Sequence, residues 1–119
     1  MATHNDIGKE GELRALAFLK EKCYAILHVN WRGKSGELDI VGLFEKRLIV
    51  VEVKTRTSLS HGEPQFFVDH NKIKKILKTT NEYIYEYNCL EEPRFDIIAI
   101  YKNKDDWSFN HIEDAFNCF

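Results

Sequence analysis

The sequence predicts an α/β domain in which helices flank a central mixed β-sheet, in the order αβββαββ. Three observations predict this class. Two segments, near residues 7–22 and 65–87, repeat apolar residues at helical spacing. Five shorter segments are rich in β-branched or aromatic residues and are separated by polar turns. The chain has 119 residues with 44% hydrophobic side chains, which fits a single domain spanning residues 1–119.

The first helix is expected to be capped by Asn5 or Asp6 and to end near Cys23. Its apolar side chains gather toward one face, which we expect to cover the sheet: Ile7, Leu13, Leu16, Ala17 and Leu19. A strand over 24–31 and a polar turn over 32–36 are expected to follow.

The next two strands are expected over 37–44 and 47–55, joined as a hairpin around residues 45–47. The second of them carries an uninterrupted apolar run over 48–51. Such a run is typical of a strand that is buried on both faces, so we place it in the middle of the sheet.

A loop over 57–64 is expected to precede the second helix, which should run from Gln65 to about Tyr87. Its apolar stripe consists of Phe67, Ile73, Ile76, Leu77 and Ile84, and four lysines lie off this stripe: Lys72, Lys74, Lys75 and Lys78. A strand over 94–101, a turn over 102–106 and a last strand over 107–112 complete the prediction.

Composition excludes several classes of protein. The net charge of −2 gives no overall attraction to nucleic acid or anionic lipid, so a polyanionic partner would need a local basic patch. The three cysteines share no CxxC spacing, which argues against a disulfide framework or a zinc site. No apolar run approaches the ~18 residues of a membrane span. We therefore expect a cytoplasmic protein without membrane association.

The central strand carries charge where a buried strand should be apolar. Side chains alternate along a strand, so Glu52 and Lys54 point the same way, and hairpin pairing would bring Asp39 close to Glu52. Two carboxylates ~4 Å apart repel by about 4 kcal/mol at an effective dielectric of ~20. Lys54 offers one compensating charge, and a divalent cation would offer two. Ligation by oxygen atoms alone favours Mg²⁺ or Mn²⁺.

A metal ion in this position would suit phosphodiester hydrolysis. A bound divalent ion lowers the pKa of water and stabilises the charge of a pentacovalent phosphorus. Lys54 would orient or help to deprotonate the water and contact the phosphate. The sequence therefore indicates a metal-dependent nuclease.

Several motifs together carry a family resemblance. They are GKEGE at 8–12, GELDIV at 36–41, VVEVKTR at 50–56, the pair Val68 and Lys72, and RFDII at 94–98. These motifs resemble the YraN family, a bacterial group regarded as endonuclease-like and similar to archaeal Holliday-junction resolvases. Asp39 with Glu52-Val53-Lys54 looks like the PD-(D/E)xK signature of restriction-endonuclease-like nucleases. The similarity extends from about residue 7 to residue 100.

The resemblance implies a restriction-endonuclease-like core and specific roles. Asp39 and Glu52 would bind the metal together with the Val53 carbonyl, and Lys54 would be the catalytic lysine. Glu12 matches an acidic residue that the resolvase-like branch adds to its metal and catalytic site. Two positions depart from the family pattern, because Leu38 replaces the proline of the signature and Cys23 replaces a turn glycine.

Nucleic acid, DNA rather than RNA, is the expected partner. The residues expected to bind it are Lys72, Lys75, Arg56 and Lys34. Other roles are open for two carboxylates near the predicted site. Glu12 would also suit the first turns of a helix, and Glu37 would pair with Arg32 or Lys34 in the hairpin.

Two other classes of function are open. One is a nucleic-acid-binding accessory protein without turnover. The other is a structural or interaction protein in which the carboxylates and lysines form an ion-pair network, and the tail AFNCF, with Phe116 and Phe119, packs on a second subunit of a homodimer. The five histidines have no metal-binding spacing and are expected to be structural or loop residues. Arg94 and Asp96 are expected to pair at the sheet edge.

Overall fold

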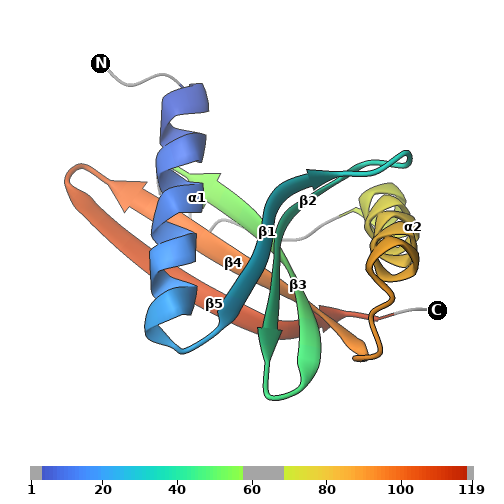
Figure 1. The fold of residues 1–119 in the computed structure, drawn as a ribbon. Helices are drawn as coiled ribbons and strands as arrows, with labels where there is room; N and C mark the ends of the chain where they lie inside the picture. Colours follow the sequence, from blue (N-terminus) through green and yellow to red (C-terminus); the bar gives the residue numbers. More distant parts are fainter. Residues whose placement is uncertain (1–3, 58–68, 118–119) are drawn as a thin grey trace.

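A computed structural model describes residues 4–57 and 69–117. It contains two helices and five strands in the predicted order αβββαββ (Figure 1). The elements are α1 (His4–Glu21), β1 (Ala25–Arg32), β2 (Glu37–Phe44), β3 (Arg47–Arg56), α2 (His70–Tyr87), β4 (Pro93–Asn103) and β5 (Asp106–Phe116). The predicted α/β class is confirmed.

The five strands form one mixed sheet in the order β1-β2-β3-β4-β5. Only β3 and β4 are parallel, because α2 connects them as a crossover, and the other neighbours are antiparallel hairpin partners. The apolar run Leu48–Val51 is fully buried in β3, the middle strand, as predicted. β5 continues four residues beyond its predicted end at Ile112, as far as Phe116.

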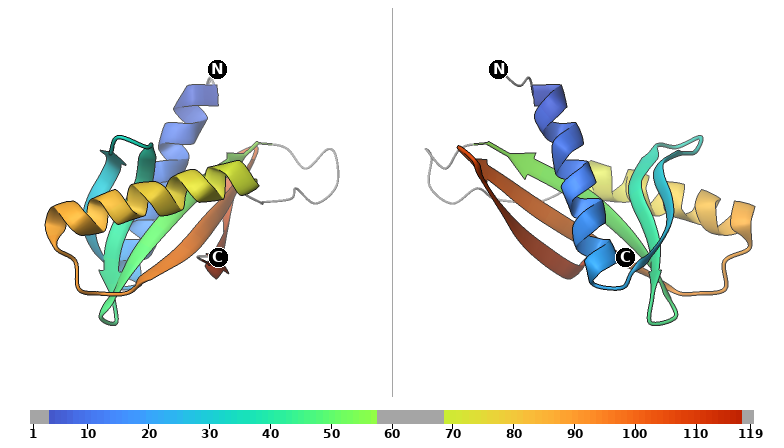
Figure 2. Two further views of the ribbon diagram at one scale, coloured as in Figure 1. Left: turned by 90° about the vertical axis from the view of Figure 1, so that its right-hand side faces the viewer. Right: turned by 60° about the vertical axis from the view of Figure 1, so that its left-hand side comes forward.

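The two helices cover opposite faces of the sheet, which makes three layers (Figure 2). Alternation along β3 divides the core between them. The core on the α1 side consists of Ala15, Leu19, Tyr24, Ile40, Ile49, Val51, Ile98 and Ile100. The core on the α2 side consists of Leu38, Val41, Leu48, Val50, Ile76, Tyr83, Phe95, Ile97 and Phe116. The second core includes Phe116, which stacks on Phe95. The expectation that Phe116 packs on another subunit is therefore wrong, and Phe119 lies outside the described residues.

The predicted sheet-facing side of α1 is partly wrong. Leu13 is 63% exposed and Ala17 is also exposed, whereas Ala15 and Leu19 are fully buried. The buried stripe continues at Gly11, four residues before Ala15. Small residues at this spacing bring the helix backbone close to the sheet, and hydrophobicity alone does not predict such a stripe.

The start of α1 differs from the prediction, whereas its end near Cys23 is as predicted. The helix begins at His4, so Asn5 and Asp6 lie within it and do not precede it as caps. It ends in a Schellman motif, in which the Tyr24 N–H donates to the Leu19 carbonyl at 3.0 Å. Cys23 adopts the left-handed conformation (φ 70°) that this motif requires, at the position where the resemblance implied a turn glycine.

α2 begins later than expected. Asp69 has an extended backbone and caps the helix by accepting a hydrogen bond from the Lys72 N–H at 2.9 Å, so the helix starts at His70. The predicted first turn, with Phe67 and Val68, and the loop over 58–64 lie outside the described residues. The predicted end at Tyr87 is confirmed by a left-handed Asn88.

Within 4–57 and 69–117, no helix is long and apolar enough to span a membrane.

Candidate functional site

The candidate site lies where β2 and β3 separate. The two strands pair in register from Phe44 and Arg47 to Ile40 and Val51, and the pairing ends there. Asp39 and Glu52 would form the next pair. Instead, a carboxylate oxygen of Asp39 accepts a hydrogen bond from the Val53 N–H at 2.9 Å. The predicted convergence of Asp39 and Glu52 is confirmed, and it occurs at a fork in the sheet.

Glu52 is a buried carboxylate whose negative charge is only partly balanced by neighbouring groups. Its side chain is 2% exposed, and its Oε2 atom has no hydrogen-bond partner. The nearest cation is Lys72, whose Nζ lies 3.6 Å from Oε1. Burial, and then the neighbouring Asp39 charge, raise the pKa of Glu52 to about 7, although Lys72 and Lys54 act in the opposite direction. Glu52 is therefore not a solvated carboxylate on the surface of the sheet.

Two further carboxylates extend this negative region. Burial also raises the pKa of Asp39, against the effect of the Val53 N–H and the Lys72 and Lys54 charges. Glu12 on α1 has a raised pKa because of burial and the charges of Asp39 and Glu37. Glu12 and Asp39 line the same hollow, so Glu12 lies near Asp39, as the resemblance implied.

The position of Glu12 depends on its neighbour Gly11. A Cβ atom at Gly11 would overlap the side chain of Thr55 on β3. Only glycine therefore allows α1 to approach the end of β3 this closely, and this approach brings Glu12 to the fork.

Asn30 is a site residue that the sequence analysis missed. It has a left-handed backbone (φ 53°) in β1, where few non-glycine residues adopt this conformation. The side-chain amide is oriented so that its oxygen and its nitrogen both face suitable partners. In this orientation the nitrogen donates hydrogen bonds to Glu12 at 2.8 Å and to Glu37 at 3.2 Å. A polar residue in a strand was the only signal, and it does not distinguish a site residue from a solvated one.

Two lysines lie at the fork. Burial lowers the pKa of Lys54, and the neighbouring Lys72 ammonium lowers it further. Partial burial also acts to lower the pKa of Lys72, but its contacts with Glu52, Lys54 and Asp39 raise it overall. Lys72 was predicted to contact phosphate near the site, and the structure places it against the buried carboxylate itself.

Two hollows meet at Asp39 and Lys72. The first, of about 550 Å³, lies between α2 and the start of β2, and its lining includes Glu37, Glu52 and Lys75. The second, of about 480 Å³, lies between α1 and the end of β3 and is lined by Gly8, Lys9, Glu12, Asp39, Val53, Lys54, Thr55, Arg56 and Lys72. Of the predicted site residues, only Lys34 lines neither hollow. Lys9 is a basic lining residue that was not predicted.

The donor set at the fork fits a hard divalent cation. Asp39, the unpartnered Oε2 of Glu52 and Glu12 supply carboxylate oxygens, and Val53 supplies a backbone carbonyl. Across residues 4–57 and 69–117, no three His, Cys, Asp or Glu side chains form a ready-made metal cluster. Mg²⁺ binds through one or two protein carboxylates and retains water and phosphate ligands, so a complete protein cage is not required.

Other predicted pairs are structural. Glu37 forms an ion pair with Arg32 at 3.1 Å, as one alternative expected. Arg94 pairs with Asp96 at 2.7 Å, but the expected position at the sheet edge is wrong, because β4 is an inner strand and Asp96 is 0% exposed. His111 also contacts Asp96, and His28 contacts Tyr83, so both histidines have structural partners.

Comparison with known proteins identifies the family. The model of the family described as "Uncharacterised protein family UPF0102" matches residues 11–100. The chain belongs to the UPF0102 family. This is the YraN family, so the resemblance seen in the sequence is confirmed. A UPF0102 protein of Flavobacterium psychrophilum is 46% identical over 119 residues, which cover all of both chains. One from Caldanaerobacter subterraneus subsp. tengcongensis is 39% identical over 95% of this chain and 93% of its own.

Proposed function

We propose that this UPF0102 protein is a restriction-endonuclease-like, metal-dependent endodeoxyribonuclease that hydrolyses DNA phosphodiesters in the manner of a Holliday-junction resolvase. The element order and the mixed five-stranded sheet support this fold assignment. The family resemblance supports the nuclease class, and the fork between β2 and β3 contains each part of the Asp39 and Glu52-Val53-Lys54 signature.

The observation that carries the proposal is the state of Glu52. A buried carboxylate with an unpartnered oxygen, next to a second carboxylate, is unfavourable for folding unless a cation compensates it. Such groups concentrate at functional sites, where strain of this kind serves binding or catalysis. In an ion-pair network both oxygens of Glu52 would have a partner. Lys72 contacts only one of them, and the other has none.

The residues at the fork would have separate roles in metal binding and in hydrolysis. Asp39, Glu52, Glu12 and the Val53 carbonyl would hold Mg²⁺ or Mn²⁺, which when bound supplies charge neutralisation and a more acidic water molecule. In hydrolysis, a water oxygen bonds to phosphorus as the bond to the leaving sugar oxygen breaks. Lys54 would donate a hydrogen bond to the phosphate, whose negative charge grows as water adds, and would orient that water.

The basic residues around the two hollows would dock the DNA backbone. Lys75 lies on the first hollow, Arg56 and Lys9 lie on the second, and Lys72 lies at their junction. The net charge of −2 makes this local cluster the main source of attraction for a polyanion. Lys34, on the β1–β2 turn, would contact DNA farther from the fork.

Cleavage of defined DNA structures tests the proposal. Labelled duplex, single-stranded and four-way-junction DNA are incubated with the protein and Mn²⁺, with and without chelator. We expect cutting that the chelator abolishes, strongest on the branched substrate. DNA binding without cutting under any of these conditions would contradict the enzyme and would favour the non-catalytic accessory protein.

A further inference from the structure

A third surface hollow lies next to the candidate site and is not used by the proposed chemistry. We call it the aromatic groove. It has a volume of about 740 Å³, lies between the β1–β2 turn and α2, and is lined chiefly by Trp31, Lys34, Lys78, Glu82 and Tyr85. Lys34 and Lys78 each directly precede a residue of the first hollow, Ser35 and Thr79 respectively. The groove is therefore continuous with the site along one strip of the surface.

The groove has a fixed shape. Glu82 on α2 accepts hydrogen bonds from the backbone N–H groups of Lys34 at 2.8 Å and Ser35 at 3.2 Å, and from the Ser35 hydroxyl. The turn is closed by a hydrogen bond from the Gly33 N–H to the Gly36 carbonyl at 2.8 Å. These contacts tie the β1–β2 turn to α2, and they direct the Glu82 carboxylate toward the turn.

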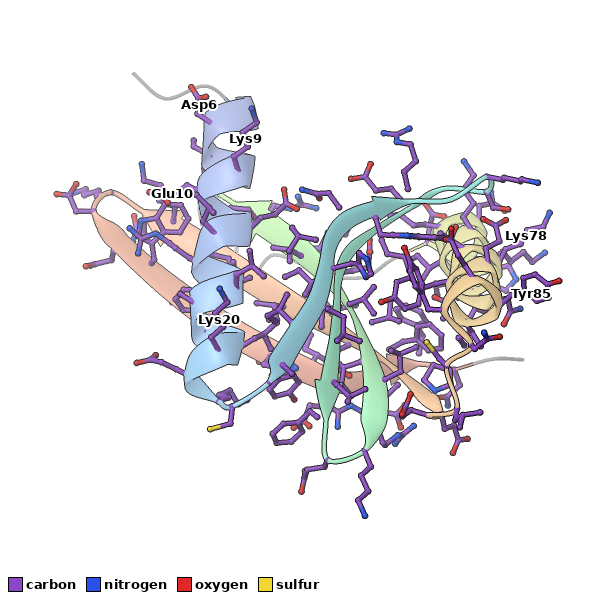
Figure 3. All side chains as sticks on the ribbon, in the orientation of Figure 1. Asp6, Lys9, Glu10, Lys20, Lys78 and Tyr85 are labelled. Carbon is purple, nitrogen blue, oxygen red and sulfur yellow. The ribbon has the colours of Figure 1, made fainter. Side chains whose placement is uncertain are left out.

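Two aromatic rings face this groove under different constraints. Trp31 is held by a hydrogen bond from its indole nitrogen to the Tyr87 hydroxyl at 3.1 Å and by edge contact with Tyr83. Tyr85 is 87% exposed, which is unusual for a large aromatic side chain. In Figure 3, Tyr85 and Lys78 both project from α2, and their seven-residue separation places them on one side of the helix.

A line of lysines connects the groove to the candidate site. Lys72, Lys75 and Lys78 follow at three-residue intervals along α2, which spreads them over about 9 Å at 1.5 Å per residue. Lys34 and Arg32, which also pairs with Glu37, add positive charge on the opposite wall. Two carboxylates line the groove as well: Glu82, which is bound to the turn, and Glu86. Aromatic rings beside a basic track are the arrangement that binds unpaired nucleotides, whose bases stack while their phosphates follow the cations.

We propose that the aromatic groove binds unpaired nucleotides of the DNA strand whose phosphate enters the fork. This inference rests on the proposed function and specifies its substrate: DNA with single-stranded or unstacked bases beside the cleavage position. Tyr85 provides the exposed stacking surface and Trp31 the fixed one.

Binding of matched probes to Tyr85 variants tests the inference. Anisotropy of a short labelled single strand and of the same sequence as blunt duplex is measured in chelator, so that no strand is cut. Tyr85→Ala should weaken single-strand binding by about 5- to 150-fold, the loss expected for one stacked base, and leave duplex binding unchanged. Tyr85→Phe should retain the affinity. Leu90→Ala, a change at another highly exposed apolar side chain outside the groove, should have no effect.

Trp31 fluorescence gives a second readout. In a Trp107→Phe background Trp31 is the remaining tryptophan, and single-stranded DNA should quench its emission while duplex should not. Unchanged single-strand affinity in Tyr85→Ala, in a protein that binds and cuts DNA in Mn²⁺, would overturn the groove and leave the proposed function intact. A loss of dimer in Tyr85→Ala without any change in DNA binding would also overturn it, because the groove would then be a protein interface. Failure of the wild type to bind or cut any DNA would overturn both proposals.

Discussion

At the scale of single residues, Glu52 determines the character of the site. Its carboxylate is buried beside Asp39, and one of its oxygens has no partner. The protein therefore keeps a group that is unfavourable for its own folding in the metal-free state. Lys54 and Lys72 offset part of this cost, and both cations line the second hollow at the fork.

The cost of Glu52 should appear as a pH dependence of stability. A pKa of about 7 in the folded protein, against 4.5 for the free side chain, means that the fold binds this proton more tightly than the unfolded chain does. Stability in chelator should therefore fall as pH rises from about 4.5 to 7, by about 3 kcal/mol in total. Glu52→Gln should remove the part of this dependence that comes from Glu52, while the raised pKa values of Asp39 and Glu12 leave a residual fall. The variant should be more stable than wild type at pH 8, as measured by urea unfolding.

The control for this experiment is Glu21→Gln, which changes an exposed carboxylate at the end of α1 and should leave the pH dependence as in wild type. If Glu52→Gln is markedly less stable than wild type at pH 8, Lys72 holds Glu52 as a structural ion pair, and the metal site is wrong.

Lys54 should be needed for chemistry and not for docking. It lines the second hollow together with Asp39 and Glu12, beside the proposed metal ligands. Lys54→Ala should therefore abolish cleavage in Mn²⁺ while DNA affinity stays within about threefold, the loss of at most one weak phosphate contact. Lys74→Ala, at an exposed position of α2 outside both hollows, is the matched control. Normal cleavage by Lys54→Ala would show that the catalytic lysine lies elsewhere.

At the scale of elements, the site depends on how α1 and α2 meet the ends of β2 and β3. Sequence patterns predicted the element order and the central position of β3, because a run of four buried apolar residues has few other interpretations. They did not predict the buried face of α1. Leu13 is more hydrophobic than Gly11, yet Gly11 faces the sheet, since close approach to Thr55 requires the absence of a side chain.

Two glycines of α1 allow a matched test of that approach. A Cβ atom at Gly8 would meet no neighbour within 4 Å, so Gly8→Ala should stabilise the helix by about 0.5–1 kcal/mol. Gly11→Ala should instead destabilise the protein by about 1–3 kcal/mol and weaken Mn²⁺ binding, because it displaces Glu12. Thermal unfolding and calorimetric Mn²⁺ titration measure the two effects. Equal stabilisation by both substitutions would show that α1 does not approach β3 closely.

The exposed face of α2 should supply a salt-dependent contact with DNA. Lys75 is exposed and lines the first hollow without an ion-pair role at the fork, so Lys75→Ala should weaken binding similarly for all sequences. The slope of log K against log salt should flatten by about 0.9, the value for one phosphate contact. Lys46→Gln, at the distant β2–β3 turn, should keep the wild-type slope. An unchanged slope in Lys75→Ala would place the docking surface elsewhere.

At the scale of the whole molecule, a three-layer fold brings residues 12, 39, 52 and 72 together although they are far apart in the sequence. The hairpin register predicted that Asp39 and Glu52 would meet, because the length of the turn determines which residues of the two strands lie opposite each other. Asn30 and Lys9 could not be predicted in this way. Their placement depends on a left-handed residue in β1 and on the contact of α1 with β3, which are tertiary features.

The response of the whole protein to Mn²⁺ tests the metal site most directly. At pH 8 and at a hundredfold excess over Kd, the free energy of unfolding should increase by about 2.7 kcal/mol if the unfolded chain does not bind the ion. Glu52→Gln should lose most of this increase, and Glu21→Gln should keep it. A wild-type unfolding curve that is the same with Mn²⁺ and with chelator would contradict the account.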